Sequence, residues 1–142
     1  MKRIVAFFAL LILLPTGCKQ SDLPPRKWLD LGTFRVEVPD TWQAIAEQGI
    51  DSQIGRLTNG SDVLAYDYGW YSYRLQNETS ATHWRTATTI DGRPALIVRP
   101  KKMGKGVIGL CVEVDDLNRL NLTGHDIRDE ATVLRIFQSV TF

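Results

Sequence analysis

The stretch SQIGRLTNGSDVLAYDYGW, residues 52–70, contains the strongest turn signal of the chain. Its centre is Asn59-Gly60, a pair typical of the turn of a β-hairpin because both residues tolerate a positive φ. The sequence on either side predicts a strand over 52–58 and a partner strand over 62–70. Along the second strand, large apolar side chains would share one face and smaller ones the other. The large set is Leu64, Tyr66, Tyr68 and Trp70. We therefore expect this hairpin to form part of an antiparallel sheet.

Two more hairpins follow along the chain. Residues 86–90 and 94–99 flank an Asp91-Gly92 turn, and residues 105–114 and 119–123 are joined through Asp115-Asp116. Each segment is short, apolar or β-branched, and bounded by turn residues, which is typical of strands. The sequence predicts a sheet built from three consecutive hairpins.

The first strand of the domain is expected over residues 33–38. TFRVEV alternates apolar and polar residues with a period of two, as a half-buried strand does. Pro39 is expected to end it. Residues 40–47 then predict a turn leading into a short helical piece, with Trp42 and Ile45 on one side.

The C-terminal segment predicts a helix over residues 127–138. Asp126 is a suitable N-cap, and Asp129 and Glu130 favour the first turn because carboxylates interact well with the positive end of the helix. The apolar face would consist of Ile127, Ala131, Leu134 and Phe137. A short strand over 139–142 would finish the chain. The expected fold class is α+β, an antiparallel β-sheet built from hairpins with a C-terminal α-helix packed on it.

The N-terminus predicts export. A basic head, Met1-Lys2-Arg3, precedes eleven apolar residues at 4–14 and the closing sequence PTGC at 15–18. This pattern is typical of a secretory signal peptide, and its apolar run is too short to cross a membrane as a helix. The segment LPTGC also resembles a bacterial lipoprotein signal. That resemblance implies cleavage before Cys18 and a lipid on its thiol. The alternative is an ordinary secreted protein in which Cys18 is incidental.

The predicted organisation has three parts. Residues 1–17 form the signal peptide, residues 18–26 the lipidated cysteine and a polar, proline-containing tether, and residues 27–142 a single α+β domain. The tether would reach at most about 30 Å. Lys19 directly after the cysteine favours the outer membrane, by resemblance to bacterial sorting rules. The expected location is the cell envelope, with the domain in the periplasm or at the cell surface.

Composition argues against a nucleic-acid partner. The chain has 17 Lys and Arg against 16 Asp and Glu. Removing the signal peptide takes away Lys2 and Arg3, so the mature chain is slightly acidic. It has no block of five like charges, such as an electrostatic nucleic-acid binder would carry.

Cysteine use fits an anchored protein. Cys18 and Cys111 are the two cysteines of the chain. Cys111 lies in the apolar stretch VIGLCVEV, residues 107–114, and is expected to be a buried structural thiol. A bridge between the two cysteines is possible if Cys18 carries no lipid.

Both ends of the predicted domain resemble the PsbP/DcrB-like domains. The resemblance lies in a strand running into Val38-Pro39-x-x-Trp42, in several hairpins, and in a helix that ends in IFQSVTF, residues 136–142. It implies a binding or assembly role at a membrane. No catalytic motif comes with it.

A polar and aromatic patch is the candidate binding site. If Asn59-Gly60 closes the first hairpin, residues near 52 and near 70 meet at its open end. Tyrosines beside a carboxylate are suited to a sugar, a peptide or another protein, since they offer apolar area and a polar tip. The proposed members are Asp51, Ser52, Arg56, Asp67, Tyr68 and Tyr71. The alternative is a buried Arg56–Asp67 ion pair, with the aromatics packed under the helix.

A small envelope hydrolase using Ser52, Asp67 or His83 is the competing functional class. It would require Ser52 and a histidine within hydrogen-bond reach in one cleft. The sequence has no zinc or calcium motif, and we predict no metal and no cofactor. We therefore expect a membrane-anchored bacterial envelope lipoprotein that acts as a non-enzymatic binding or assembly module. Its partner would be another envelope protein or a small ligand. A structural or stress-related lipoprotein without a defined ligand is a further alternative.

Overall fold

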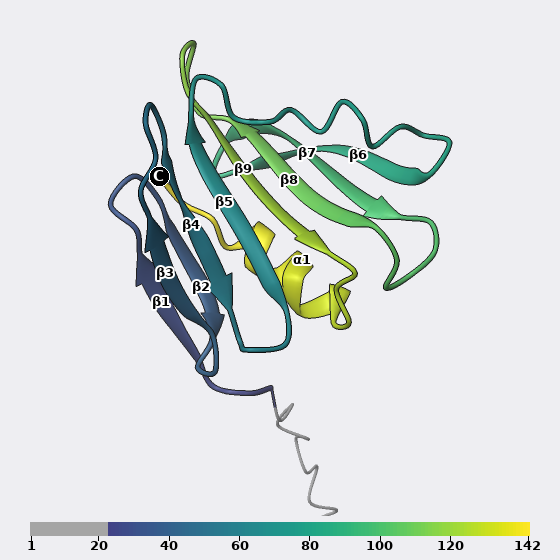
Figure 1. Cartoon of the computed structure of the whole chain (residues 1–142), viewed down its shortest axis with the longest axis horizontal. Helices are drawn as coiled ribbons and strands as arrows, with labels where there is room; N and C mark the ends of the chain where they lie inside the picture. Colours follow the sequence, from purple (N-terminus) through teal and green to yellow (C-terminus); the bar gives the residue numbers. More distant parts are fainter. Residues whose placement is uncertain (1–22) are drawn as a thin grey trace, which may run out of the picture.

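The computed structural model describes residues 23–142, so the signal peptide and Cys18 lie outside the described residues. The fold belongs to the α+β class and is dominated by antiparallel sheet, as expected (Figure 1). The described elements are β1 (Arg26–Asp30), β2 (Arg35–Pro39), β3 (Gln43–Glu47), β4 (Gln53–Thr58), β5 (Val63–Gly69), β6 (His83–Ile90), β7 (Arg93–Pro100), β8 (Val107–Glu113), β9 (Arg119–His125) and α1 (Glu130–Gln138).

The described strands form two antiparallel sheets. The large sheet has seven strands in the order β3-β4-β5-β9-β8-β7-β6, and β1 and β2 form a separate two-stranded sheet. In the large sheet β5 pairs with β9, so the hairpin around Asn59 and the hairpin of β8 and β9 meet in the centre. This pairing joins residues 50–60 positions apart in the sequence, so local turn signals do not indicate it.

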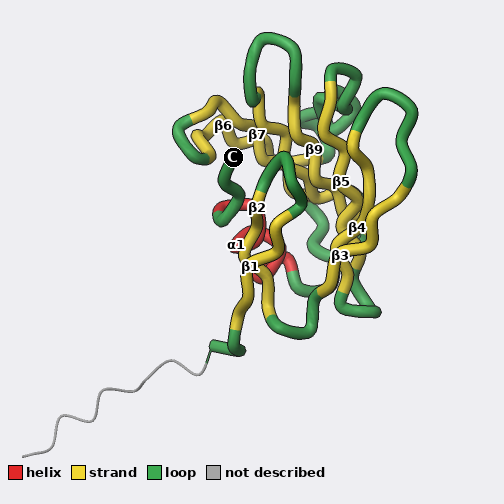
Figure 2. Tube along the Cα trace, turned by 90° about the vertical axis from the view of Figure 1, so that its left-hand side faces the viewer, coloured by secondary structure: helices red, strands yellow, loops and turns green. Residues whose placement is uncertain are grey.

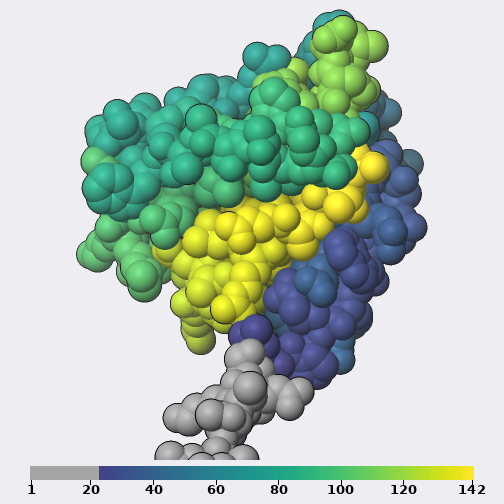
Figure 3. Space-filling view, turned by 180° about the vertical axis from the view of Figure 1, so that it is seen from behind, coloured from purple at the N-terminus to yellow at the C-terminus, as the bar shows by residue number. Residues whose placement is uncertain are grey.

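The main core lies between the large sheet and a second layer. α1 and the β1–β2 sheet lie on one face of the large sheet, called here the inner face (Figure 2). Phe34 from the β1–β2 turn meets Tyr66 of β5 edge to face, with ring centroids 5.6 Å apart. Seen from behind, the C-terminal residues run between the N-terminal strands and the β6–β8 side of the large sheet (Figure 3).

The hairpins predicted at Asn59-Gly60 and Asp91-Gly92 both form, but only the second has the two positive φ angles expected of its turn. Asp91 and Gly92 both have positive φ, 48° and 74°, and connect β6 to β7 directly. The β4–β5 connection is longer than a two-residue turn, because the register pairs Thr58 with Val63. The Asn59 side chain supports this loop by accepting hydrogen bonds from the backbone N–H groups of Ser61 and Asp62. An asparagine therefore stabilises the turn through its side chain as well as its backbone.

The predicted helical piece at residues 40–47 is wrong. Residues 43–47 form β3, an edge strand that pairs with β4 in the register Ile45 opposite Arg56. Trp42 is buried in the core while Ile45 is 39% exposed, so the two do not share a buried face. Pairing with β4 satisfies the backbone hydrogen bonds that a short helix would have made, and this long-range pairing overrides a weak local preference.

The C-terminal helix begins three residues later than predicted. Its N-cap is Asp129, whose carboxylate accepts a hydrogen bond from the Thr132 N–H at 3.0 Å. Asp126 has a φ of 51° and instead accepts from the Gly106 N–H at 2.6 Å, which holds the pKa of its carboxyl below the usual range. Asp126 therefore ties the end of β9 to the β7–β8 loop.

The predicted apolar face of α1 is confirmed in part, since Phe137 lies in the core and Leu134 packs against it. Val133, Ile136 and Phe137 face the core, whereas Ala131 is exposed. Beyond the helix, the predicted strand over residues 139–142 is reduced to a single bridge between Thr141 and Arg35. The later start of the helix explains the shift, since it removes Ile127 from the helical register.

The start of the domain was placed one residue late. Arg26, which we assigned to the tether, is the first residue of β1 and pairs with Pro39 of β2. The sequence RKWLD of β1 gives little sign of a strand because most of its side chains are charged. β2 supplies its partner, and the Arg26 side chain reaches Glu37 at 3.1 Å.

A long connection from Trp70 to Thr82, called the strap, lies against the outer face of the large sheet. Leu75 on the strap has a φ of 58° and is buried with Val98 and Cys111 in a second, smaller core. Asn121 of β9 donates a hydrogen bond to the Tyr73 carbonyl at 3.0 Å, and Arg85 of β6 donates to the Leu75 carbonyl at 2.8 Å. The strap is therefore fastened to the sheet by both apolar and polar contacts.

The expected burial of Cys111 is confirmed. Desolvation, reinforced by the nearby Glu113 carboxylate, raises the pKa of the Cys111 thiol to about 11. The unfolded chain loses this proton near the ordinary thiol value, whereas the folded protein retains it. Folding is therefore linked to proton binding at Cys111 in the alkaline range.

We expect the free energy of unfolding to fall as the pH rises from about 9 to about 11, because the unfolded state then binds fewer protons than the folded state. Urea titrations at several pH values measure this effect. Cys111→Ala is the control, since it removes the part of the slope that comes from this thiol and keeps the part from the buried tyrosines. Identical slopes for the two proteins would contradict the assignment.

Candidate functional site

The candidate site lies at one end of the large sheet. The loop of residues 48–52 connects β3 to β4 there, and the strap begins there, directly after β5. This is the upper end in Figure 1, whereas the described chain begins at Leu23 at the lower end. The two segments meet because β4 and β5 are antiparallel neighbours, so the start of one lies beside the end of the other.

Two glycines allow this close approach. A Cβ atom on Gly69 would lie 2.7 Å from the Cβ of Ser52, and one on Gly49 would lie 2.0 Å from the Ser52 carbonyl oxygen. Such distances are far below van der Waals contact. Glycine at both positions therefore lets the 48–52 loop fold back on itself and rest against the end of β5.

A hollow of about 440 Å³ opens between this loop and the strap. Its lining residues are Gln48, Gly49, Ile50, Asp51, Ser52, Ile54 and Tyr71. Ile50 is fully exposed and the Tyr71 side chain is 80% exposed. Both therefore present apolar area to solvent beside the carboxylate and hydroxyl groups of Asp51 and Ser52.

A second hollow, of about 520 Å³, lies on the other side of Tyr71. It is lined by Trp70, Tyr71, Ser72, Tyr73, Arg74, Gln76 and Arg119. The Trp70 and Tyr71 rings are 6.4 Å apart between centroids and tilted by 39°. Trp70 is 54% exposed, so the pair forms an aromatic ridge between the two hollows. We call residues 48–52, Ile54, Trp70 and Tyr71 the Tyr71 surface.

Arg119 holds the aromatic ridge in place. It is buried beneath the strap and donates hydrogen bonds to the Trp70 carbonyl and, at 3.4 Å, to the Ser72 carbonyl. The Ser72 hydroxyl donates to the Asp67 carbonyl at 3.0 Å. The backbone under the two exposed rings is therefore fixed, and ordering it on binding would carry little entropic cost.

Three of the six predicted site residues come together in the structure. Asp51, Ser52 and Tyr71 line the same hollow. Tyr68 does not join them, because its side chain packs against the main core on the inner face, where burial raises the pKa of its hydroxyl.

The alternative interpretation, a buried Arg56–Asp67 ion pair, is wrong. Arg56 instead pairs with Glu47 of β3 at 2.5 Å, and Asp67 lies opposite Ile54 in the β4–β5 register. One carboxylate oxygen of Asp67 is buried without a hydrogen-bond partner among residues 23–142. Neither residue lines the hollow beside Tyr71.

Further residues belong to the site in addition to the predicted ones. Trp70 was assigned to the core face of a strand, but the strand ends at Gly69 and the alternation ends with it. Ile50 is an isolated apolar residue in an otherwise polar loop, and this is the one feature of the sequence that could have indicated its place in the site. Gln48 and Gly49 complete the set as loop neighbours of Ile50.

The hydrolase arrangement is not assembled in the described residues. Ser52 precedes β4, whereas His83 begins β6, five strand positions away in the same sheet. At a spacing of about 4.8 Å per strand this separation is roughly 24 Å. The His83 Nδ1 contacts the Thr82 hydroxyl at 2.8 Å instead. Within residues 23–142, no group of three or more His, Cys, Asp or Glu is placed to hold a metal ion.

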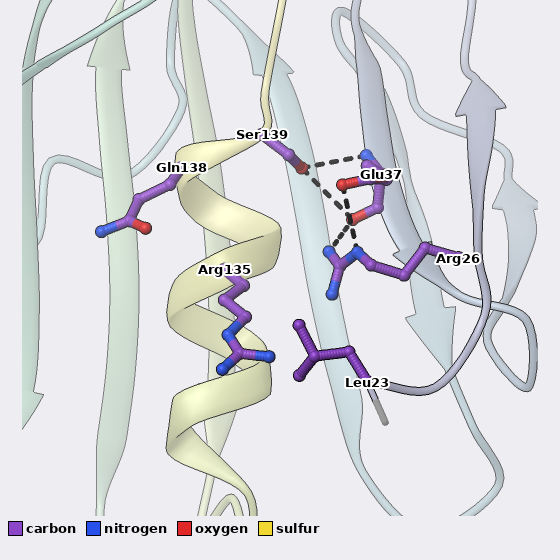
Figure 4. A pocket seen from close by; sticks show the side chains of 6 residues that line it. All are labelled: Leu23, Arg26, Glu37, Arg135, Gln138 and Ser139. Carbon is purple, nitrogen blue, oxygen red and sulfur yellow. Dashed lines mark hydrogen bonds and ion pairs between the residues drawn. The ribbon is translucent and has the colours of Figure 1, made fainter. Parts of the chain in front are cut away.

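A different hollow, of about 340 Å³, lies beside the C-terminal half of α1 (Figure 4). Arg26 donates to the Glu37 carbonyl at 2.9 Å and pairs with its carboxylate. Ser139 accepts a hydrogen bond from the Glu37 N–H at 2.9 Å. These groups bind one another and connect α1 to the β1–β2 sheet. We therefore assign them a structural role.

No family model, curated protein or solved structure matches the chain. The single helix of the described part is not long and apolar enough to cross a membrane. The chain is thus an α+β domain with an exposed aromatic surface at one end of its large sheet, and hydrogen bonds fix the backbone beneath that surface.

Proposed function

We propose that this protein is a membrane-anchored lipoprotein of the bacterial envelope and acts as a non-enzymatic binding or assembly module. The Tyr71 surface would bind another envelope protein or a small ligand. The single observation that carries the proposal is the aromatic ridge of Trp70 and Tyr71, exposed between two hollows on a fixed backbone.

The chemistry of this surface fits recognition. Tyrosine and tryptophan are enriched at protein interfaces because a large apolar ring and a polar tip are delivered at a low entropic cost. Ile50 extends the apolar area, and Asp51 offers a carboxylate for a cationic or hydrogen-bonding group of the partner. A polypeptide with an apolar side chain flanked by a basic one would satisfy both features.

The position of the surface fits a tethered domain. With a lipid on Cys18, the chain would leave the membrane at the end of the domain where Leu23 lies, and the Tyr71 surface lies at the other end (Figure 1). The binding surface would then point away from the lipid. Confinement to the membrane raises the effective concentration of any partner in the same envelope, so a modest affinity suffices.

The proposed role is the one that the PsbP/DcrB-like resemblance implies. The hydrolase alternative receives no support from geometry, because the strand order separates Ser52 from His83. A structural lipoprotein without a ligand would not need two exposed aromatic rings beside a hollow.

Intact-mass measurement of protein from the membrane fraction tests the anchor. We expect a mature mass that begins at residue 18 and includes acyl chains, and Cys18→Ala should lose the acyl mass and leave the membrane fraction. An unmodified, soluble wild-type product would remove the anchor from the proposal.

Photo-crosslinking in intact cells tests the binding surface. A photoreactive phenylalanine derivative at Ile50 is expected to give one discrete adduct. Adding Tyr71→Ala should reduce that adduct by at least about tenfold, the effect of truncating a central aromatic contact. Trp28→Ala is the matched control, since Trp28 is an exposed ring on β1, outside the Tyr71 surface. An adduct equally strong with Tyr71→Ala and with Trp28→Ala would refute the assigned surface.

A further inference from the structure

β6 is one of the two edge strands of the large sheet. Among residues 23–142, β6 pairs with β7 on one side and with no strand on the other (Figure 1). It is eight residues long, and most of its side chains are exposed. An edge strand of this kind presents unpaired N–H and C=O groups to any strand that can align with them.

The ladder shows which backbone groups point outward. The Lys101 N–H donates to the Thr82 carbonyl at 3.0 Å, and the His83 N–H turns the other way, to the Thr79 carbonyl at 2.9 Å. Because the direction alternates along an antiparallel strand, even-numbered residues of β6 face β7. Arg85, Ala87 and Thr89 therefore direct their N–H and C=O groups away from the sheet.

The β6 edge lacks the short length and the charged side chains that protect the β3 edge from pairing with another strand. β3, at the opposite edge, is five residues long and carries the Glu47–Arg56 ion pair. β6 carries one side chain with a permanent charge, Arg85, and its guanidinium donates to the carbonyls of Leu75 and Glu78 on the strap. The exposed middle of β6 is the neutral sequence TATT, residues 86–89. Charged side chains that would repel an incoming strand are thus missing from the middle of β6.

We propose that β6 pairs antiparallel with β6 of a second copy of this chain, so that the two large sheets form one continuous sheet. A two-fold arrangement requires a self-complementary strand, and the neutral residues 86–89 meet this requirement. Threonines facing threonines across such a pair are favourable neighbours. This inference is independent of the function proposed for the Tyr71 surface.

Charge restricts the register of the pair. With the two-fold axis at Thr86, Ala87 or Thr88, Arg85 lies opposite Ala87, Thr89 or Asp91 of the second copy. An axis at residue 85 would place Arg85 opposite its own equivalent, and an axis at residue 89 would carry the pairing past the turn that follows Ile90, where β6 ends. Like charges directly opposite each other are unfavourable in a sheet. The axis therefore falls within residues 86–88.

Cysteine scanning in the full-length chain tests this pairing. Thr86→Cys, Ala87→Cys and Thr88→Cys are oxidised in intact cells, with the wild-type chain as the baseline for Cys18 and Cys111. Opposed residues of an antiparallel pair lie about 4.5–5.5 Å apart between Cα atoms, within the range of a disulfide. We expect the covalent dimer to exceed the baseline by at least about fivefold at one of the three positions and to decrease on either side. Ala44→Cys on the β3 edge is the matched control and should stay at the baseline.

A charge substitution supplies the second arm of the test. Adding Ala87→Lys to the best crosslinking variant places two ammonium groups close to the axis and should lower the dimer yield by at least about fivefold. The urea midpoint of Ala87→Lys should equal that of the wild type, because residue 87 is exposed. Yields at the baseline for all three positions, or an equal yield for Ala44→Cys, would overturn the proposal. A yield unaffected by Ala87→Lys in a folded protein would also overturn it.

Discussion

Replacing Trp42 by alanine is expected to lower the free energy of unfolding by about 3–5 kcal/mol, the usual cost of deleting a large buried ring. Trp42 is 2% exposed and is among the largest fully buried side chains of the described residues. It lies between β2 and β3, where the two sheets of the fold are connected. Loss of the indole would leave a cavity at this junction, which the rigid strands on either side cannot close.

Urea unfolding followed by circular dichroism measures this loss. Trp84→Ala is the matched control, because Trp84 is 56% exposed and is in contact mainly with Lys101 through a cation–π interaction. We expect that variant to lose at most about 1 kcal/mol. Similar losses for the two variants would contradict the assignment of Trp42 to the core.

The segment after Trp42 forms a strand although its spacing predicts a helix. The short spacing from Trp42 to Ile45 suggests one side of a helix. The structure instead turns the chain after Trp42 and pairs residues 43–47 with β4. An edge strand with all five residues exposed has no apolar alternation, so periodicity carries no information about it.

Local signals predicted the parts of the fold that depend on neighbours in sequence. The Asp91-Gly92 turn requires two positive φ angles, which this dipeptide supplies, and the hairpin formed where expected. The pairing of β5 with β9 and the burial of the strap depend on contacts distant in sequence. Leu75 illustrates the difference, since a leucine in a polar stretch gives no sign that it fills a second core with Val98 and Cys111.

The sequence predicts the part of the candidate site that depends on the register of the β4–β5 hairpin. Register brought Asp51 and Ser52 to the end of β5, beside Tyr71. Asp67 on β5 and Glu47 on β3 are both diagonal neighbours of Arg56, and Arg56 pairs with Glu47. A partner strand that the sequence did not reveal thus changed which charges meet.

Replacing Arg119 by methionine is expected to lower the free energy of unfolding by about 2–4 kcal/mol and to release the strap. Hydrogen bonds from charged donors contribute roughly 1.5–3 kcal/mol each, and Arg119 donates to the carbonyls of both Trp70 and Ser72. Methionine retains most of the apolar stem of arginine, so the loss reports on the guanidinium more than on packing. Without that group, the backbone beneath Trp70 and Tyr71 loses two of its ties to β9, while the Asn121 contact to Tyr73 remains.

Hydrogen exchange over residues 70–73, together with urea unfolding, separates the local effect from the global one. We expect the amides of this segment to lose protection more than those of β8 in the Arg119→Met protein. Arg128→Met is the matched control, since Arg128 is exposed and its side chain makes no hydrogen bond or ion pair with another described residue. If the amides of residues 70–73 were equally protected from exchange in the Arg119→Met and Arg128→Met proteins, the Arg119 guanidinium would not be the group that fixes the aromatic ridge. The crosslink from Ile50 provides a functional readout, because a loosened ridge must be ordered again on binding and the adduct should decrease accordingly.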